Sequence, residues 1–361
     1  MRILIDATSV LLRSAGIKSY TYHWIENLRA TADGDEISAF PLLTKLGRLD
    51  HERSVLSPAA TYARLGLLYF VNVPGNPAID WMATDADVFH LSNQVRNAPR
   101  KVLLTATIHD LTCWLMPEFH TPANVRADKS FAEHVLRRAR RLIAVSENSR
   151  QDAIRLLGLH PDRIDVIHSG VSNAYFTAQP LAAPKPYVLF VGTIEPRKNV
   201  ETLLDAWHLV RPEMRAAFDL LVVGATGWGS DRTLGRLQAS PDGVRYRGYV
   251  EESELPAITA GASAFVYPSL YEGFGFPVAQ AMACGVPVIT SNNSCLPEIA
   301  GAGALLVDPR SPAEIALALD RLLTSSSLSA QIGSEGRRRA ENYRWTTCAQ
   351  RSLEFFRKAA G

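Results

Sequence analysis

The sequence predicts an α/β fold with two domains, each built around a mainly parallel β-sheet. The chain has 361 residues, which is too long for one ordinary hydrophobic core. Short apolar and β-branched segments alternate with longer helical patterns, as in strand–helix–strand units. A segment rich in proline and alanine, 177–186, separates two halves of similar layout.

Each half contains six segments that we expect to form strands. In the first half they are 2–6, 37–41, 88–92, 102–110, 142–146 and 164–169. In the second half they are 187–192, 220–224, 244–249, 264–268, 286–290 and 304–307. Ligands of open parallel sheets bind beyond the carboxyl ends of the strands. Polar residues directly after these segments are therefore the candidates for a binding site.

The proline-rich segment predicts where one domain ends and the next begins. We assign 1–178 to an N-terminal domain, 179–186 to the linker and 187–340 to a C-terminal domain. A final helical pattern covers 346–358. We expect the tail, 341–361, to form a helix that packs back on the N-terminal domain.

Composition and charge indicate a globular protein without a strong electrostatic field around it. Hydrophobic residues make up 47% and charged residues 20%, which excludes a disordered chain. The formal net charge is only +2, so we expect no nucleic-acid partner. Residues 1–6 are typical of a first strand rather than a secretory signal, and no segment approaches the roughly 20 apolar residues that cross a bilayer.

The cysteines are scattered and favour a reducing cytoplasm over disulfides or a metal site: Cys113, Cys284, Cys295 and Cys348.

The most informative segment is 267–285, which joins a strand to a helix. Pro277 suits the first turn of that helix, and Gly285 is expected to end it. The backbone amides of 274–276 then lie at or near a helix N-terminus, where they favour an anion or an oxygen-rich ligand. Glu272 would be the acceptor beside them. The alternative is a glycine-rich turn that only joins a strand to a core helix.

A second cluster, 192–199, follows the first strand of the second half. Asn199 is a good N-cap for a helix over 200–210, so Arg197 and Lys198 stand directly before a positive helix end. A diphosphate is the natural ligand, because a pair of cations can offset its charge without a metal. The alternative is a solvated basic loop.

The first half offers two weaker candidates. The segment 13–20 follows the first strand and leads into a helix, and Gly16 lies in what resembles a phosphate-approach turn without the spacing of a dinucleotide fingerprint. His109 and Asp110 close the strand 102–110, at the expected binding edge of the sheet. An imidazole there could donate to a hydroxyl or to a leaving oxygen. A structural His–Asp pair that holds a loop is the alternative.

These residues resemble those of the retaining glycosyltransferase family 4. The most specific parts of the resemblance are 192–199, 268–287 and 296–309, and the first half agrees through 109–110 and 145–149. It covers nearly the whole chain. The resemblance implies the GT-B architecture, in which two Rossmann-like domains face each other across a cleft. The N-terminal domain would be the acceptor side, and the C-terminal domain would bind the nucleotide sugar.

The resemblance implies roles residue by residue. Arg197 and Lys198 would hold the donor diphosphate, and Glu272 with the amides after it would hold hydroxyls of the donor sugar. Gly16 would let the backbone approach the donor phosphates or the acceptor, and His109 would sit near the transferring carbon. The catalytic candidates are His109, Glu272, Arg197 and Lys198. The donor-binding candidates are Gly16, Thr193, Arg197, Lys198, Val250, Glu272, Gly273, Phe274, Gly275, Phe276 and Gln280.

One position departs from the family pattern. The family motif ends with a second glutamate eight positions after the first, and this chain has Gln280 there. A glutamine can still bond a ribose hydroxyl, but it lacks the charge that strengthens such bonds. We therefore expect weaker nucleotide binding with the chemistry retained.

The resemblance also implies the mechanism and the substrates. Transfer would retain the anomeric configuration and need no metal or other cofactor, with the departing diphosphate stabilised by Arg197, Lys198 and helix-end amides. Glu272 is not assigned as a nucleophile, because the family is thought to avoid one. Similarity to bacterial surface-polysaccharide mannosyltransferases favours GDP-mannose as the donor and a lipid-linked saccharide as the acceptor.

Two other functions stay open. A sugar-nucleotide epimerase of the same fold would release an altered sugar nucleotide without any acceptor. A nucleotide-sugar-binding protein with weakened catalysis would bind the donor and not turn it over, and Gln280 is the feature that favours it.

Asp85 and Asp87 have the spacing that metal-dependent glycosyltransferases of the other major fold use for Mn²⁺ or Mg²⁺. They precede a strand, which puts them at the opposite end of the sheet from the expected site. We therefore interpret them as a solvated turn and assign no metal ligands.

Contact with an anionic membrane is a further possibility. The apolar segment 65–71 and the basic run 137–141 could together dock on a bilayer that carries a lipid-linked acceptor. The alternative is an ordinary core helix and a solvated helix face.

Overall fold

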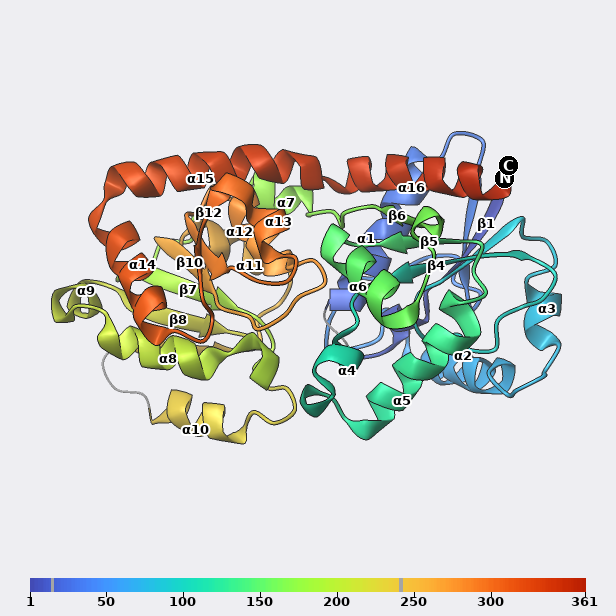
Figure 1. Ribbon diagram of the computed structural model, residues 1–361, viewed down its shortest axis with the longest axis horizontal. Helices are drawn as coiled ribbons and strands as arrows, with labels where there is room; N and C mark the ends of the chain where they lie inside the picture. Colours follow the sequence, from blue (N-terminus) through green and yellow to red (C-terminus); the bar gives the residue numbers. More distant parts are fainter. Residues whose placement is uncertain (14–15, 240–242) are drawn as a thin grey trace. The chain divides into compact units, whose positions relative to one another are not determined.

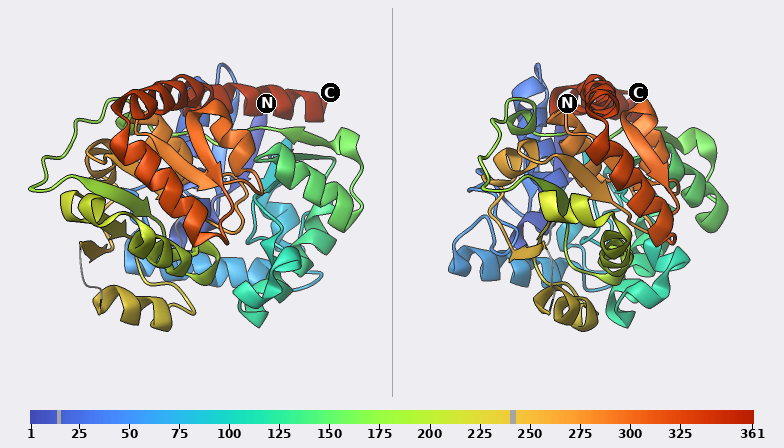
Figure 2. Two further views of the ribbon diagram at one scale, coloured as in Figure 1. Left: turned by 60° about the vertical axis from the view of Figure 1, so that its left-hand side comes forward. Right: turned by 90° about the vertical axis from the view of Figure 1, so that its left-hand side faces the viewer.

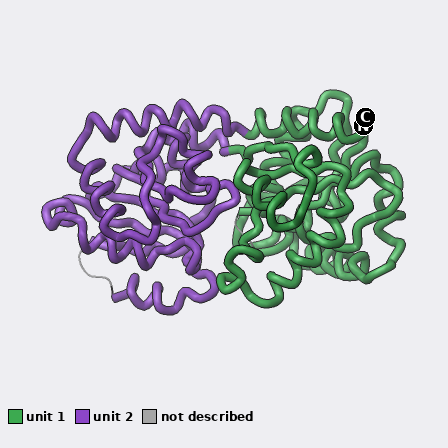
Figure 3. The backbone as a smooth tube through the Cα atoms, in the orientation of Figure 1, with its two compact units in different colours: residues 1–170, 345–361 green, residues 171–344 purple. Residues whose placement is uncertain are grey.

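The computed structural model describes residues 1–13, 16–239 and 243–361. The chain divides into two compact units (Figure 3). Unit 1 consists of Met1–Gly170 and Trp345–Gly361, and unit 2 of Val171–Arg344. Each unit contains a six-stranded parallel sheet with helices packed around it (Figures 1 and 2). The predicted α/β class with two parallel-sheet domains is confirmed.

The sheet of unit 1 has the strand order β2-β1-β3-β4-β5-β6, and every pairing is parallel. Its strands are β1 (Arg2–Asp6), β2 (Glu36–Phe40), β3 (Val88–Leu91), β4 (Leu103–Ile108), β5 (Arg141–Ala144) and β6 (Ile164–Val166). The strand order reverses between β1 and β3, and such a switch point is where open α/β sheets bind ligands.

The helices of unit 1 connect these strands. They are η1 (Thr8–Leu11), α1 (Gly16–Thr31), α2 (Pro58–Val71), α3 (Ala78–Met82), α4 (Thr112–Leu115), η2 (Pro117–Phe119), α5 (Pro122–Phe131), the π-helical turn η3 (Ala132–Leu136), α6 (Glu147–Leu157), η4 (Pro161–Arg163) and α16 (Trp345–Ala360). A serine cap and a glycine mark the two ends of α6. Ser146 accepts a hydrogen bond from the amide of Ser149 (3.1 Å), and Gly158 ends the helix in the left-handed conformation.

The sheet of unit 2 has the order β12-β11-β10-β7-β8-β9, again with parallel pairing. Its strands are β7 (Tyr187–Val191), β8 (Asp219–Val223), β9 (Val244–Gly248), β10 (Ala264–Tyr267), β11 (Val288–Ser291) and β12 (Ala304–Val307). The strands β8, β10 and β11 are buried along their whole length, which explains their continuous apolar sequences. The switch point of this sheet lies between β7 and β10.

The helices of unit 2 alternate with its strands. They are α7 (Asn173–Phe176), η5 (Pro196–Lys198), α8 (Val200–Leu209), α9 (Pro212–Ala217), α10 (Asp231–Gln238), α11 (Leu255–Ala260), α12 (Phe276–Ala283), α13 (Leu296–Ala300), η6 (Gly301–Gly303), α14 (Pro312–Thr324), α15 (Ser326–Ala340) and η7 (Glu341–Tyr343).

The division between the units falls at Gly170 and Val171, before the segment 179–186 that the sequence suggests as the linker. The difference has a physical cause in long-range contacts. The Val171 amide donates to the Tyr343 carbonyl (2.6 Å), and Arg337 donates to the Phe176 carbonyl (2.6 Å). Residues 171–176 are thereby held to the end of unit 2.

The C-terminal helix α16 belongs to unit 1, where it packs along α1 (Figure 1). The indole N–H of Trp24 donates to the Ser352 hydroxyl (2.9 Å), and both groups are buried. Lys358 and Asp165 form an ion pair at 2.9 Å. The last helix therefore completes the core of the first unit.

Among the described residues, the helices are all too short or too polar to span a bilayer.

Candidate active site

The strongest candidate site lies at the switch point of unit 2. β7 and β10 are neighbours in the sheet, so the segments that follow them start from the same edge. Arg197 and Lys198 follow β7, and Glu272 follows β10. The topology thus joins the two clusters that the sequence singles out from distant parts of the chain.

The segment after β7 is held by Asn199, which adopts a left-handed conformation with φ of 60°. Asn199 occupies the N-cap position of α8, as expected, but its side chain does not cap the helix. Its amide group instead donates to the carbonyls of Pro268 (3.0 Å) and Pro309 (2.7 Å). The predicted capping role is therefore wrong, because the side chain ties three loops together.

The segment after β10 turns sharply into α12. Gly275 is the N-cap with φ of 84°, and a Cβ atom there would lie 2.7 Å from the Leu296 side chain. The positive φ favours glycine at this position, and a larger residue would also displace the end of the Leu296 side chain. Pro277 lies in the first turn of α12 and Gly285 follows its end, as the sequence predicts. The amides of 274–276 are accordingly at the start of this helix.

Glu272 is buried and accepts hydrogen bonds at both carboxylate oxygens. Its Oε1 accepts from Lys198 Nζ (2.6 Å), Ser269 Oγ (2.7 Å) and the Tyr267 hydroxyl (3.0 Å). Its Oε2 accepts from the Arg197 guanidinium (3.1 Å). Three donors thus share the two lone pairs of Oε1, whereas Oε2 has two lone pairs and one donor. Oε2 therefore keeps the capacity to accept one more hydrogen bond, such as that of a ligand hydroxyl.

The charges around Glu272 keep it ionised. Burial acts to raise its pKa, but the charges of Lys198 and Arg197 and the hydrogen bonds from Lys198 and Ser269 outweigh burial and lower the pKa from 4.5 to about 2. Glu272 is thus a permanent acceptor at neutral pH.

Arg197 is fixed in place by several bonds. It donates to the Tyr271 carbonyl (2.7 Å) and pairs with Glu195 (2.8 Å) as well as with Glu272. The two cations of the cluster thus meet two carboxylates. The sequence predicts a surplus of positive charge at this site. In the structure, Glu195 and Glu272 pair with the two cations and fix their positions.

The other donor-site candidates of unit 2 lie near the same sheet edge. Thr193 comes two residues after β7, and the buried Val250 comes two residues after β9. Gln280 is on α12, four residues from its start, and is partly exposed. Phe274 is buried against Tyr343, with ring centroids 5.6 Å apart. Glu272 forms ion pairs with Arg197 (3.1 Å) and Lys198 (2.6 Å), and the rings of Phe274 and Phe276 pack edge-on with centroids 5.2 Å apart.

His109 follows β4 in unit 1 and is held by neighbours that the sequence did not single out. Its Nε2 lies 3.1 Å from the Ser92 hydroxyl, and its ring meets Tyr20 edge-on with centroids 4.9 Å apart. Burial lowers the pKa of His109 to about 4, against the opposing charge of Asp110. The imidazole is therefore neutral at pH 7 and can exchange hydrogen bonds with a substrate oxygen.

Asp110 serves a different partner. Its carboxylate accepts from the amide (2.9 Å) and the hydroxyl (2.6 Å) of Thr112. It thereby shapes the start of α4, while His109 bonds Ser92. His109 and Asp110 therefore make separate contacts, with Ser92 and with Thr112. This arrangement differs from the alternative of a His–Asp pair that holds a loop.

Gly16 is the first residue of α1, and a Cβ atom there would meet no atom within 4 Å. Ser14 and Ala15, also part of the candidate turn, lie outside the described residues. Lys18 is buried and donates to the carbonyls of Leu12 (2.8 Å) and Arg53 (2.6 Å). It stabilises the turn, so it is not presented to a phosphate.

Asp85 and Asp87 precede β3, at the amino end of the strand. Asp87 accepts from the backbone amide of Arg2 (2.7 Å), and Asp85 lies 3.9 Å from the Arg2 guanidinium. These contacts are those of a surface turn beside the first strand.

Three polar partners escaped sequence reasoning: Tyr267, Ser269 and Ser92. Tyr267 ends β10, Ser269 lies two residues further on, and Ser92 directly follows β3, so all three lie at the edge where ligands bind. Residues two positions apart in an extended segment point to the same side. The placement of Tyr267 and Ser269 on either side of Pro268 was therefore the available signal in the sequence.

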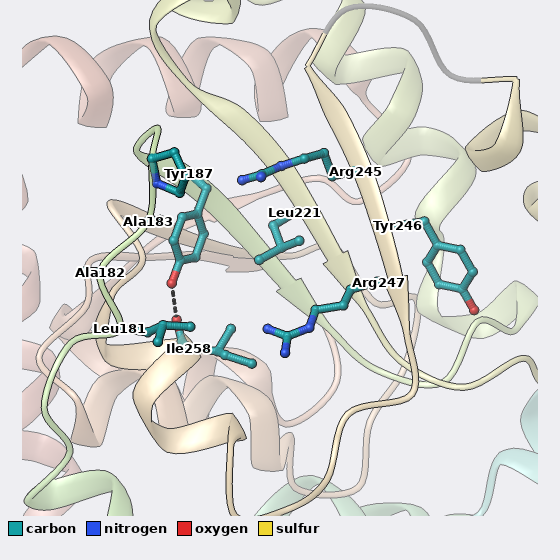
Figure 4. Close-up of a pocket in the computed structure, with 10 residues that line it drawn as sticks. Leu181, Ala182, Ala183, Tyr187, Leu221, Arg245, Tyr246, Arg247 and Ile258 are labelled. Atoms are coloured by element: carbon teal, nitrogen blue, oxygen red, sulfur yellow. Dashed lines mark hydrogen bonds between the residues drawn. The ribbon is translucent and has the colours of Figure 1, made fainter.

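Unit 2 also contains a cavity of about 350 Å³ between the segment 181–184, α11 and the strands β8 and β9 (Figure 4). Its floor is apolar, with Leu181, Leu221 and Ile258. The Tyr187 hydroxyl on its wall donates to the Ile258 carbonyl (2.6 Å). Arg245 and Arg247 at its rim pair with Asp219 (2.9 Å) and Glu254 (3.4 Å). The cavity contains none of the candidate residues.

Comparison with known proteins identifies both halves of the chain. Residues 172–339 match the family model described as glycosyl transferases group 1, and residues 15–174 match that of glycosyltransferase family 4. The O-antigen chain mannosyltransferase B of Escherichia coli is 33% identical over 282 residues, which cover 74% of this chain and 72% of that protein.

Solved structures with the same fold cover the full chain. Sucrose-phosphate synthase from Thermosynechococcus elongatus superposes with a TM-score of 0.75 at 21% identity, over 99% of this chain and 98% of that one. HepE of Anabaena, solved with UDP-glucose, gives 0.72 at 18% identity, over 99% and 100%. These likenesses establish the GT-B fold. The chain belongs to glycosyltransferase family 4 and resembles its bacterial mannosyltransferases.

Proposed function

We propose that this chain transfers a hexose, mannose from GDP-mannose, to a saccharide acceptor with retention of the anomeric configuration. The observation that supports the donor site is the buried Glu272 that accepts hydrogen bonds from Arg197 and Lys198 at the switch point of unit 2. Such a site combines fixed cations with helix-end amides, which together suit a sugar diphosphate.

In the proposed reaction the bond between the anomeric carbon and the diphosphate oxygen breaks, and a bond to an acceptor oxygen forms on the same face. Arg197 and Lys198 stabilise the charge that develops on the departing diphosphate. The leaving phosphate oxygen takes the proton of the acceptor hydroxyl. The two cations supply the stabilisation that a metal ion would give, so we propose that the reaction is metal-independent.

Glu272 acts in this scheme by positioning. Its carboxylate is occupied by four hydrogen bonds and its pKa is about 2, which suits a fixed acceptor rather than an attacking group. The remaining lone pair of Oε2 would orient a hydroxyl of the donor sugar. The neutral His109 would bond the sugar near the transferring carbon.

The choice of substrates rests on the relatives. The similar Escherichia coli protein is named an O-antigen chain mannosyltransferase, which supports mannose and a polysaccharide acceptor. HepE is solved with UDP-glucose, which supports a nucleotide sugar as the donor. We propose a lipid-linked saccharide as the acceptor, and a cytoplasmic reaction at the inner face of the membrane.

The first test is calorimetric titration of the chain with GDP, UDP and ADP, with and without EDTA. We expect GDP to bind tightest, with an affinity that EDTA leaves unchanged. Arg197→Ala should weaken binding at least about tenfold, since a charge-assisted hydrogen bond contributes roughly 1.5–3 kcal/mol. Failure of all three nucleotides to bind would refute the donor site.

A second measurement separates transfer from the other functions. The chain is incubated with GDP-mannose and a lipid-linked mannosyl saccharide, and products are followed by mass spectrometry. Transfer predicts a saccharide longer by one hexose. A changed sugar nucleotide formed without acceptor would indicate an epimerase, and tight binding with no product would indicate a binding protein.

A further inference from the structure

Three neighbouring strands of unit 1 bring polar residues together at the carboxyl edge of its sheet. β3 pairs with β4, and β4 pairs with β5, all in parallel. Ser92 directly follows β3, His109 directly follows β4, and Ser146 lies two residues after β5. Because parallel strands end at one edge of a sheet, the fold itself places these groups side by side.

The backbone of His109 is held from the side of β5. The hydroxyl of Ser149 donates to the His109 carbonyl oxygen (3.3 Å), and the hydroxyl of Ser146 donates to that of Ser149 (3.1 Å). Ser146 also caps α6 by accepting from the Ser149 amide (3.1 Å). Both serines belong to the segment 145–149, on which part of the family resemblance rests. Their contacts fix the point from which the imidazole ring extends.

The ring of His109 is fixed on two sides. The Ser92 hydroxyl lies 3.1 Å from Nε2, and the Tyr20 ring meets the imidazole edge-on with centroids 4.9 Å apart. Ser92 is 5% exposed and Tyr20 is 1% exposed, whereas His109 is partly exposed. Among the residues that the structure describes, none bonds Nδ1 of His109. Nδ1 is thus the ring nitrogen that remains for a substrate.

At pH 7 the ring of His109 carries one proton, which can occupy either nitrogen. Burial lowers the pKa of His109 to about 4, against the charge of Asp110. The carboxylate of Asp110 bonds the start of α4, and the nearby His90 is buried with both ring nitrogens bonded to threonine hydroxyls (2.9 and 2.8 Å). Neither group bonds the His109 ring, so the hydroxyl of Ser92 is the group that decides the tautomer.

The Ser92 hydroxyl has one proton to donate. Within the described part of the chain, the group that this hydroxyl contacts is Nε2 of His109. Buried hydroxyl groups are normally hydrogen-bonded, and a buried donor without an acceptor is costly. If Nε2 carried the ring proton, the hydroxyl would accept that proton's hydrogen bond and its own proton would lack an acceptor. The contact therefore favours an unprotonated Nε2 and a proton on Nδ1.

We propose that Ser92 is a positioning residue: its hydroxyl donates to Nε2 of His109, so that the ring presents an Nδ1–H donor to an oxygen of the donor sugar. This inference rests on the proposed function, in which His109 bonds the sugar near the transferring carbon. A ring nitrogen that already carries a proton cannot take another from the acceptor hydroxyl. His109 is thus a hydrogen-bond donor rather than a general base, which leaves that proton to the departing phosphate.

The first test is nuclear magnetic resonance of the full chain with ¹⁵N-labelled histidine rings, at pH 7 and without substrates. Protonated and unprotonated ring nitrogens differ in ¹⁵N chemical shift, so the spectrum reports the tautomer directly. The signals of His109 are assigned by their loss in His109→Gln. We expect the Nδ1–H tautomer in the wild type and in Ser92→Thr, which keeps the hydroxyl. In Ser92→Ala we expect a measurable population of the Nε2–H tautomer.

The matched control is Ser130→Ala, which removes the hydroxyl of another serine beside a histidine. Ser130 Oγ on α5 lies 3.4 Å from Nδ1 of His134 on η3. This variant should leave the tautomer of His109 unchanged. An Nε2–H tautomer in the wild type would overturn the proposal even if a variant failed to fold. An unchanged Nδ1–H tautomer in Ser92→Ala would overturn it as well.

Kinetics then connect the tautomer with the reaction. With GDP-mannose and a saccharide acceptor, we expect Ser92→Ala to lower kcat about two- to tenfold, as for the loss of one neutral hydrogen bond, with the KM of the donor nearly unchanged. Ser92→Thr should restore kcat, and a wild-type kcat in Ser92→Ala would overturn the positioning role. A chain that transfers no sugar, yet shows an Nδ1–H tautomer that Ser92→Ala removes, would count against the proposed function and still support the hydrogen bond from Ser92.

Discussion

A buried carboxylate that accepts four hydrogen bonds is stable only while its donors stay in place. In unit 2 the donors to Glu272 come from two segments far apart in the chain, Lys198 and Arg197 on one side and Ser269 and Tyr267 on the other. The carboxylate therefore has a structural task besides the one proposed for the donor sugar. Its removal should affect stability as well as activity.

We expect Glu272→Gln to lower the free energy of unfolding of unit 2 by on the order of 3 kcal/mol at pH 7, since it leaves the buried Lys198 without its charged partner and leaves Arg197 with Glu195 alone. The folded-state pKa of Glu272, about 2, lies below its ordinary value of 4.5. The ionised group therefore stabilises the fold above about pH 4.5, and that contribution is lost as the pH falls toward 2. The difference between wild type and variant should shrink in the same window.

Urea unfolding followed by circular dichroism from pH 7 to pH 2.5 measures both effects. Glu213→Gln, at a side chain 59% exposed, is the matched control and should change stability little. An unchanged gap between wild type and Glu272→Gln across the whole range would contradict the assignment.

The site could be predicted from the sequence as far as its loops. Arg197, Lys198 and Glu272 follow strands that local pattern identifies, and the glycines mark where the backbone must turn. The side-chain partners could not be predicted, because a tyrosine or serine at a strand end is common and its direction depends on the neighbouring strand. Asn199 shows the same limit, since its cap-like position does not reveal bonds to Pro268 and Pro309.

At the scale of elements, every predicted strand segment contains a strand, whereas the boundary between the units differs from the predicted one. Buried parallel strands are continuous apolar runs and can be recognised locally. Residues 171–176 belong to unit 2 through bonds to 337–344, more than 160 residues away. The composition of a local segment does not reveal a contact with residues so far away in the sequence.

The same kind of long-range contact fixes α16 to α1. Ser352→Ala removes the acceptor of the Trp24 indole N–H and leaves that donor buried without its partner. We expect unit 1 to lose about 1–3 kcal/mol of unfolding free energy. Gln350→Ala, exposed on the same helix, is the control and should be neutral. Chemical unfolding monitored by tryptophan fluorescence measures the stability of both variants. Equal stabilities would argue against a buried hydrogen bond between Trp24 and Ser352.

At the scale of the whole molecule, each unit has its own sheet and its own core, while the proposed diphosphate site lies in unit 2 alone. A ligand that binds only the folded form of one unit stabilises that unit by mass action. Nucleotide should therefore act unequally on the two halves of the chain.

Hydrogen exchange with and without GDP tests this. At a GDP concentration about 100 times its dissociation constant, amides of unit 2 that exchange through its unfolding should slow by about 100-fold, equivalent to about 2.7 kcal/mol. Amides of unit 1 should change far less, including those of α16, which is separated in sequence but shares the core of that unit. Arg197→Ala, if it binds about tenfold more weakly, should cut the slowing to about 10-fold or less at the same concentration. Equal slowing in both units would mean that they unfold together, so that the stability given by the nucleotide is shared across the chain.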